Sequence, residues 1–119
     1  MIDEKIDMSK VLYILLMLII FTASQAFSQI EARHFNAEWN NANDVSWFMD
    51  LKECKSKGIT DIGKNPKDAT KYKIAVVPTI IIFKDGEEAL RFQADLSFKM
   101  VATKKEVQEA IDELLMSDF

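Results

Sequence analysis

The sequence predicts an α/β domain with a four-stranded mixed sheet flanked by helices. Three observations predict this fold class. Residues 76–83, "VVPTIIIF", form an almost unbroken apolar run, which is typical of a central strand buried on both faces. Residues 103–115 carry the apolar spacing of an amphipathic helix. The segments before and between them give the order strand, helix, strand, short helix, hairpin, helix.

The first half of the domain reads as a strand–helix–strand unit. Residues 30–35 predict a short strand, and residues 41–58 predict a helix that Gly58 ends. One face of this helix would be apolar, at the spacing i, i+4 and i+7: Trp47, Leu51 and Cys54. A second strand follows at residues 59–62. A unit of this kind predicts a right-handed crossover between parallel strands.

The second half predicts a hairpin with helices on either side of it in the chain. Asn65-Pro66 is a favourable helix opening, so residues 65–72 predict one or two helical turns. Asp85-Gly86 predicts a tight turn after the central strand, and residues 89–94 should return antiparallel to it. The last helix should begin with a capping box, in which Thr103 and Glu106 satisfy the first backbone N–H groups.

The N-terminus carries an apolar segment of a different kind, Val11 to Phe21. It is shorter than the roughly 20 residues that cross a bilayer, and it matches the apolar core of a secretory signal. Cleavage after Ala26 would divide the chain into a leader, 1–26, and a domain, 27–119, with cleavage after Ser28 as a second position. The alternative is an uncleaved membrane anchor over residues 11–27. Either reading predicts export: a periplasmic, secreted or membrane-anchored protein that faces away from the cytoplasm.

Composition excludes several classes of protein. The chain has 119 residues, of which 49% are hydrophobic, so a single packed domain is expected. The net charge of −4 gives no electrostatic case for a nucleic-acid partner. One cysteine and one histidine offer no metal-ligand cluster, and no motif indicates a cofactor. A single cysteine also cannot form an internal disulfide.

Two stretches resemble the thioredoxin-like superfamily. "FNAEW", residues 35–39, looks like the strand end that precedes the thioredoxin active site. "NPKDATKYKIAVVPTIIIFKDGEE", residues 65–88, resembles the second half of a thioredoxin, with Val-Pro-Thr as its most specific part. The resemblance covers Phe35 to about Leu115. It implies a minimal thioredoxin-like fold, a cis Val77–Pro78 bond beside the site, and an extended polypeptide partner that pairs with the backbone of Val77.

The chain departs from the family where the chemistry would take place. Thioredoxins carry Cys-Gly-Pro-Cys directly after the tryptophan, whereas this chain has Asn40-Asn41-Ala42-Asn43 after Trp39. Thiol–disulfide exchange needs a thiolate and a partner sulfur, so the family reaction cannot occur at these positions. Asparagine is a favoured N-cap residue. We therefore interpret Asn40 as a helix cap, with hydrogen bonding of a ligand by Asn40 and Asn43 as the alternative.

Three other features carry alternative interpretations. Cys54 is interpreted as a small buried residue, with an exposed redox thiol as the alternative. His34, which matches the family's buried acid, is interpreted as a satisfied strand histidine rather than a proton carrier. "LSFKMVA", residues 96–102, is a longer link than the family usually has. Its apolar residues would pack under the last helix or, if exposed, form a partner-binding patch.

The leading hypothesis is an exported, redox-inactive module that binds an extended peptide or protein. Its binding surface would consist of Trp39, the Asn40, Asn41 and Asn43 turn, Val77 and Pro78. One alternative is a redox enzyme that works through Cys54 alone. Another is a structural subunit that contacts the membrane only through residues 11–27.

Overall fold

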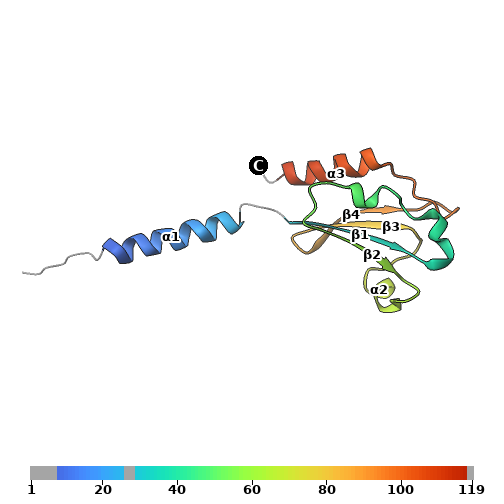
Figure 1. Ribbon diagram of the computed structural model, residues 1–119, viewed down its shortest axis with the longest axis horizontal. Helices are drawn as coiled ribbons and strands as arrows, with labels where there is room; N and C mark the ends of the chain where they lie inside the picture. Colours follow the sequence, from blue (N-terminus) through green and yellow to red (C-terminus); the bar gives the residue numbers. More distant parts are fainter. Residues whose placement is uncertain (1–7, 26–28, 118–119) are drawn as a thin grey trace, which may run out of the picture.

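The computed structural model describes residues 8–25 and 29–117 and contains one domain preceded by a separate helix (Figure 1). This helix, α1, spans Met8–Gln25 and lies apart from the sheet (Figure 1). Its side chains from Leu12 to Met17 are exposed. In the described part of the chain, no helix has the length and apolarity that a membrane crossing needs. The predicted cleavage position after Ala26 lies outside the described residues.

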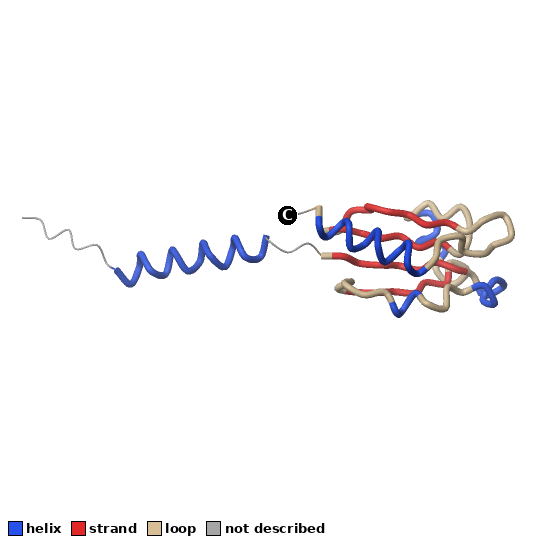
Figure 2. The backbone as a smooth tube through the Cα atoms, turned by 90° about the horizontal axis from the view of Figure 1, so that it is seen from above, coloured by secondary structure: helices blue, strands red, loops and turns tan. Residues whose placement is uncertain are grey.

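The domain is built on a four-stranded sheet in the order β2-β1-β3-β4. The strands are β1 (Ile30–Asn36), β2 (Ser56–Asp61), β3 (Thr79–Lys84) and β4 (Glu87–Gln93). β1 runs parallel to β2 and antiparallel to β3, and β3 runs antiparallel to β4. Figure 2 shows the strands side by side with a helix lying across them. The predicted mixed, four-stranded sheet is therefore confirmed.

The hairpin of β3 and β4 forms where the sequence predicts it. The first five residues of β3 are buried, in keeping with its central place between β1 and β4. Asp85 and Gly86 both have positive φ angles, 53° and 86°. Two successive positive φ angles favour a type I′ turn, whose twist matches that of a two-stranded hairpin.

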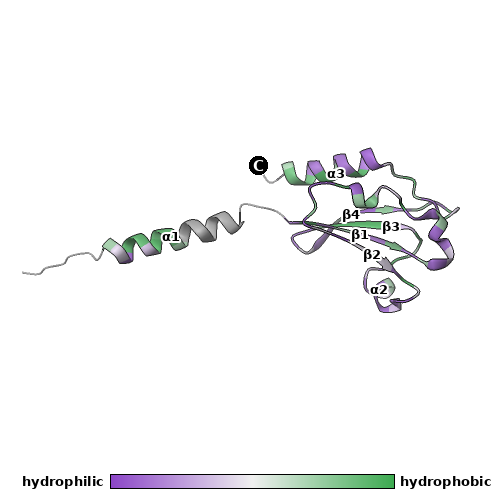
Figure 3. Cartoon of the chain, in the orientation of Figure 1, coloured by the Kyte–Doolittle hydropathy of each residue, from purple (hydrophilic) through white to green (hydrophobic). Residues whose placement is uncertain are grey.

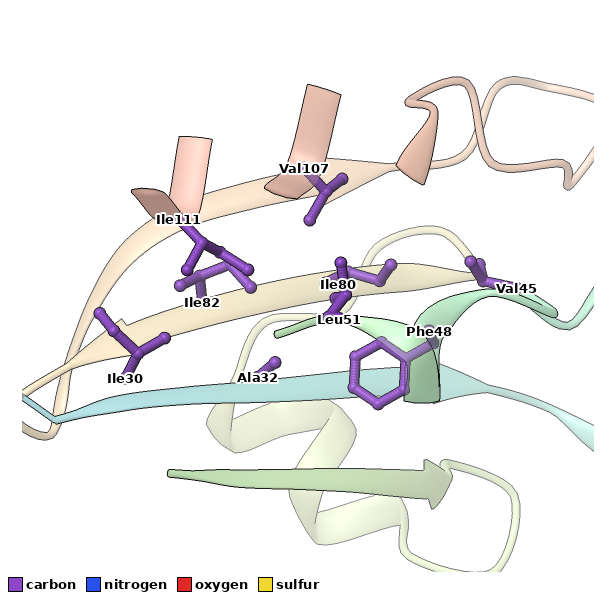
Figure 4. Close-up of a cluster of buried hydrophobic side chains, with 9 residues drawn as sticks. All are labelled: Ile30, Ala32, Val45, Phe48, Leu51, Ile80, Ile82, Val107 and Ile111. Carbon is purple, nitrogen blue, oxygen red and sulfur yellow. The ribbon is translucent and has the colours of Figure 1, made fainter. Parts of the chain in front are cut away.

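Helices cover the two faces of the sheet unequally. The helix α3 (Lys104–Met116) lies on one face, where Val107 and Ile111 join the main core (Figures 1 and 4). Hydropathy along α3 alternates between apolar and polar residues, as an amphipathic helix requires (Figure 3). Thr103 caps it, because its hydroxyl oxygen accepts the Glu106 N–H at 3.2 Å. The short helix α2 (Pro66–Lys71) accompanies a smaller cluster on the other face, around Phe35, Ile81 and Phe83.

The helix predicted over residues 41–58 is absent. The chain forms two 3₁₀ helices instead, η1 (Glu38–Asn43) and η2 (Phe48–Asp50). Gly58 lies inside β2 and ends no helix. Residues 44–55 must return along the sheet to start a parallel strand. As an α-helix they would rise about 18 Å, roughly the length of β2, with no residues left for the turns.

Candidate functional site

The candidate site lies where β1 ends and four segments meet. These segments are the end of β1, η1, the loop before β3, and the turn between β4 and α3. Trp39 is 68% exposed, and the neighbouring Asn40 is only 5% exposed. The predicted site residues therefore divide into a buried group beneath the surface and an exposed group on it.

Asn40 is the centre of the buried group. Its side-chain amide nitrogen lies 3.0 Å from Asn36 Oδ1, 3.3 Å from Val77 O and 3.1 Å from Phe98 O. An amide NH₂ has two hydrogens, so these three acceptors share two donors. The Asn40 side-chain oxygen in turn accepts a hydrogen bond from Asn43 Nδ2 at 2.8 Å. One side chain thus joins β1, η1, the loop before β3 and the turn before α3.

The prediction that Asn40 caps a helix is wrong. Ala37 occupies the N-cap position of η1, with no side-chain cap, and Asn40 lies inside η1 with non-helical angles. Its side-chain oxygen faces Asn43 rather than a free backbone N–H. The physical reason is burial: a buried amide must find partners for its donors and its acceptor, and the surrounding segments supply both.

Asn36 and Asp44 extend this network toward β1. The Asn36 side-chain nitrogen donates to Asn40 O at 3.1 Å and to a carboxylate oxygen of Asp44. Asn36 is itself 4% exposed. Sequence reasoning overlooked both residues as site residues. The available signal was the density of Asn and Asp at positions 36, 40, 43 and 44, where each side chain can pair with its neighbours.

Val77 and Pro78 lie beneath the surface of the site rather than on it. The Val77–Pro78 peptide bond is cis. Val77 is 4% exposed, and Pro78 is among the fully buried side chains. Because the carbonyl of Val77 faces the Asn40 amide, part of the backbone proposed to pair with a partner is already engaged within the chain.

The turn between β4 and α3 brings an unpredicted residue into the site. Phe98 packs its ring edge-to-face against Trp39, with 5.1 Å between ring centroids. Asp95 holds the turn, since one of its carboxylate oxygens accepts from the Ser97 N–H at 2.8 Å and from the Ser97 hydroxyl. These bonds from Ser97 lower the pKa of the Asp95 carboxyl.

The apolar link over residues 96–102 divides into exposed residues and residues that pack against the core. Leu96, Phe98 and Val101 are exposed, by 95%, 42% and 66%. Met100 and Ala102 instead pack against the main core. Of the exposed residues, Phe98 contacts Trp39, and we call this aromatic pair the Trp39–Phe98 patch.

Two open grooves lie between η1 and the end of β2, and the larger one borders Trp39. The larger has a volume of ≈ 610 Å³ and lies between Trp39 and the turn after β2. The smaller, of ≈ 240 Å³, is lined by Asn41, Asp44 and residues of β2. Glu38, Asp61 and Lys64 border both grooves. The exposed group therefore combines an aromatic pair with polar and charged walls.

His34 is buried directly under this region. Its Nε2 atom accepts the Val45 N–H at 3.2 Å, and its ring packs on Phe48 at 5.4 Å between centroids. Within the described residues, its Nδ1 atom has no hydrogen-bond partner, so only one half of the interpretation as a satisfied histidine holds. Burial lowers the pKa of His34, while the nearby Asp44 carboxylate opposes this effect.

We expect the His34 pKa to make the domain less stable in acid. The folded pKa lies below the ordinary value of 6.5, so the unfolded chain binds a proton more readily than the folded one. The contribution of neutral His34 is complete above that value and is lost as pH falls from 6.5 toward the folded pKa. Urea unfolding at pH 8 and pH 5 should show this loss, and His34→Leu should reduce the difference. An unchanged pH dependence in His34→Leu would assign the loss to other groups.

Cys54 lies at the opposite end of the sheet from Asn40. It precedes Lys55, whose N–H bonds to Ile30 O at the start of β1, whereas Asn40 follows the end of that strand. No helix carries it, but it does pack against the main core and is half-buried. Burial raises the pKa of its thiol, and Lys57 only partly offsets the rise. A raised pKa leaves the thiol a poor nucleophile at neutral pH.

The described residues contain no cluster of His, Cys, Asp or Glu side chains able to hold a metal ion. The exposed part of the site offers aromatic, amide and carboxylate groups. The buried part can hold those groups in place.

Comparison with solved structures gives the fold a family context. A mutant thioredoxin from Halobacterium salinarum matches with a TM-score of 0.57 and 18% identity, over 73% of this chain and 75% of that one. The chain has a thioredoxin-like fold. Fasciola hepatica thioredoxin matches with a TM-score of 0.51 and 20% identity, over 80% of this chain and 89% of that one.

Sequence comparison points the same way over a shorter stretch. The chain is 46% identical to chloroplastic thioredoxin Y1 from Arabidopsis thaliana over 46 residues, which are 39% of this chain and 27% of that protein. The matches span about a quarter of the length of the curated thioredoxins concerned. No protein-family model matches the chain. The thioredoxin-like fold thus stands on structure, and by that resemblance Asn40 and Asn43 occupy the positions of the Cys-x-x-Cys pair.

Proposed function

We propose that the protein is an exported, redox-inactive module that binds an extended peptide or another protein. One observation carries this proposal: the position of the family's first catalytic cysteine is held by Asn40, buried in a hydrogen-bonded network. An amide in that network can neither attack a disulfide nor release a thiolate. What it does is fix the segments that present the Trp39–Phe98 patch.

The proposed binding surface is displaced outward from the one that the sequence alone suggested. Val77 and Pro78 support it from below, while Trp39 and Asn41 are exposed beside the two grooves. Exposed tryptophan is enriched among residues that dominate binding energy, because a large ring buries much area with few rotatable bonds. The edge-to-face contact with Phe98 holds the Trp39 ring in one orientation, which reduces the entropy lost on binding.

Trp39→Ala should weaken binding of the selected partner by about tenfold or more, the usual size of a hot-spot loss. The probe is a set of extended peptides selected from a random displayed library against the whole chain. Binding is followed by fluorescence polarisation of the labelled peptide. The matched control is Met49→Ala, which removes another exposed apolar side chain, 52% exposed, away from the patch. Equal loss in both variants, or none in Trp39→Ala, would contradict this surface.

The alternative of a redox enzyme working through Cys54 makes a different prediction. We expect the wild type not to accelerate the reduction of insulin disulfides by dithiothreitol, and Cys54→Ser to behave identically. A positive control can be built on the same fold. The side chains of Asn40 and Asn43 already meet at 2.8 Å, so Asn40→Cys with Asn43→Cys should gain catalysis. Wild-type turnover that disappears in Cys54→Ser would support the single-thiol enzyme instead.

Export is part of the same proposal and rests on the N-terminal apolar segment. A cleaved signal would leave a chain that begins near Phe27, and a retained anchor would leave residues 11–27 in place. Intact-mass measurement of the exported protein separates the two. A retained segment would favour the third candidate, a membrane-anchored structural subunit.

A further inference from the structure

The strand β2 ends the sheet and leaves one side of its backbone without a strand neighbour. Within residues 29–117, β2 pairs only with β1. Ile59, in the middle of β2, is 64% exposed. A Cβ atom added at Gly58 would meet nothing within 4 Å, so the face of β2 opposite to Ile59 is open at this residue. An exposed edge strand with an apolar residue at its centre is a template for another strand.

The parity of the β1–β2 ladder shows which groups face outward. Asn36 lies opposite Asp61, and the Ile62 N–H bonds to Asn36 O at 2.9 Å, so residue 62 faces β1 with its backbone. Alternate residues of a strand face the same neighbour. The backbone groups of Gly58 and Thr60 therefore face β1, and those of Lys57, Ile59 and Asp61 face the open side.

The side chains at this edge have a separate order. Lys57 lies opposite Ala32, and Ile59 opposite His34, both of which point to the face that α3 covers. Asp61 follows on the same face, by the two-residue period of a strand. This face of the edge thus presents a row of one cation, one apolar residue and one anion: Lys57, Ile59 and Asp61.

We propose that β2 pairs antiparallel with β2 of a second copy of this chain, with Ile59 on the two-fold axis. In that register Ile59 meets the partner's Ile59, and Lys57 meets the partner's Asp61 on both sides of the axis. The row therefore pairs favourably with an antiparallel copy of itself, cation to anion and apolar residue to apolar residue. Antiparallel pairing about a two-fold axis is the self-complementary arrangement that a symmetric dimer requires.

Competing registers are poorer. Outward-facing backbone groups must oppose one another, so the register can change only in steps that keep this parity. Shifting the axis to Gly58 sets Lys57 against the partner's Ile59. Shifting it one step further sets Lys57 against the partner's Lys57, and like charges directly opposite are destabilising.

Both charged groups retain capacity for this contact. Lys57 Nζ donates to Met49 O and to Leu51 O, and an ammonium has three donors. Asp61 Oδ1 accepts the Gly63 N–H at 2.8 Å, and a carboxylate has a second oxygen. Since the pairing is antiparallel, the two Trp39–Phe98 patches would lie toward opposite ends of the joined sheet and could engage two partners.

Cross-strand disulfide formation tests the register. Ile59 and its copy would form a hydrogen-bonded pair with about 5.5 Å between Cα atoms, within the range of a disulfide. The test uses the whole chain with Cys54→Ser and Ile59→Cys, kept in mild detergent because α1 exposes apolar side chains, and oxidised over a range of dilutions. Its matched control is Ser56→Cys on the same background. In the proposed register the two residues 56 are about 20 Å apart.

We expect the Ile59→Cys chain to give covalent dimer faster than the Ser56→Cys chain by about tenfold or more, since only the first pair meets disulfide geometry. Association through α1 would raise both rates together and leave their ratio near one. Adding Lys57→Glu to the Ile59→Cys chain should lower the yield, because it places a carboxylate opposite Asp61. Equal rates for the two positions, or no dimer from Ile59→Cys in a chain with wild-type circular dichroism, would overturn the proposal.

Discussion

Asn40→Asp is expected to destabilise the domain by roughly 3–5 kcal/mol, the cost of leaving an uncompensated charge in a buried site. The wild-type amide gives its two N–H groups to Val77 O, Phe98 O and Asn36 Oδ1. A carboxylate has no donor for any of these oxygens. The substitution keeps the shape of the side chain and reverses the sign of its interactions.

The size of this effect separates the two interpretations of Asn40. At a helix N-cap, aspartate would be as good as asparagine or better, because it adds negative charge at the positive helix end. At the centre of a buried network it leaves three oxygens facing a charge of the same sign. Urea unfolding followed by circular dichroism at pH 7.5 measures the difference. If Asn40→Asp leaves the free energy of unfolding unchanged, Asn40 acts as a helix cap.

Two variants calibrate this result. Asn40→Ala should lower the free energy of unfolding by about 2 kcal/mol, since it leaves buried acceptors without a donor and adds no charge. Asn41→Asp makes the same chemical change one residue further on, where the side chain is exposed. It should fall within about 0.5 kcal/mol of the wild type, as surface substitutions usually do. A comparable loss in Asn41→Asp would mean that charge near this end, rather than burial, is responsible.

The elements that the sequence predicted well depend on local patterns. Each of three local patterns favours a single conformation: the apolar run of β3, the Asp85-Gly86 turn and the apolar stripe of α3. An apolar run interrupted only by Thr79 favours a central strand, and Asp-Gly accepts the positive φ angles of a type I′ turn. For these elements the surrounding structure and the local signal agree.

The segment over residues 41–58 was mispredicted because its apolar spacing is compatible with two conformations. Trp47, Leu51 and Cys54 all contact the core, as the helical spacing predicted. A chain of 3₁₀ turns and extended residues can turn the same side chains inward. The deciding quantity was not local: the distance that residues 44–55 must cover to begin a parallel strand.

The sequence predicted where the candidate site lies in the fold but not how far its residues are buried. Trp39, Asn40, Val77 and Pro78 do gather at the end of β1, as the resemblance implied. The sequence did not show that three of them are buried. One partner of the buried Asn40 is the carbonyl of Phe98, in the turn before α3. That turn is held by Asp95 and comes from a stretch remote in sequence, so no pattern around residue 40 encodes it.

Phe48→Ala is expected to cost about 3–5 kcal/mol, the usual penalty for removing a buried aromatic ring. Phe48 has no exposed surface and packs in the main core beside Leu51 and Ala32 (Figure 4). Its ring also covers His34 at 5.4 Å, so its loss opens a path for water to that imidazole. The control is the neighbouring Met49→Ala, which removes an exposed side chain and should change stability by less than about 0.5 kcal/mol.

Glu53→Gly, measured beside Phe48→Ala by the same urea unfolding, decides whether tertiary packing or a helix holds this segment. Glu53 has a φ angle of 65°, which glycine adopts at no steric cost. In the observed conformation Glu53→Gly should therefore be neutral or stabilise the domain by a few tenths of a kcal/mol. In a helix the same change would cost about 1 kcal/mol. A large loss in Phe48→Ala with none in Glu53→Gly is the expected pair of results, because packing anchors the segment and no helical hydrogen bonds run through residue 53. A loss of about 1 kcal/mol in Glu53→Gly would restore the helix that the sequence predicted.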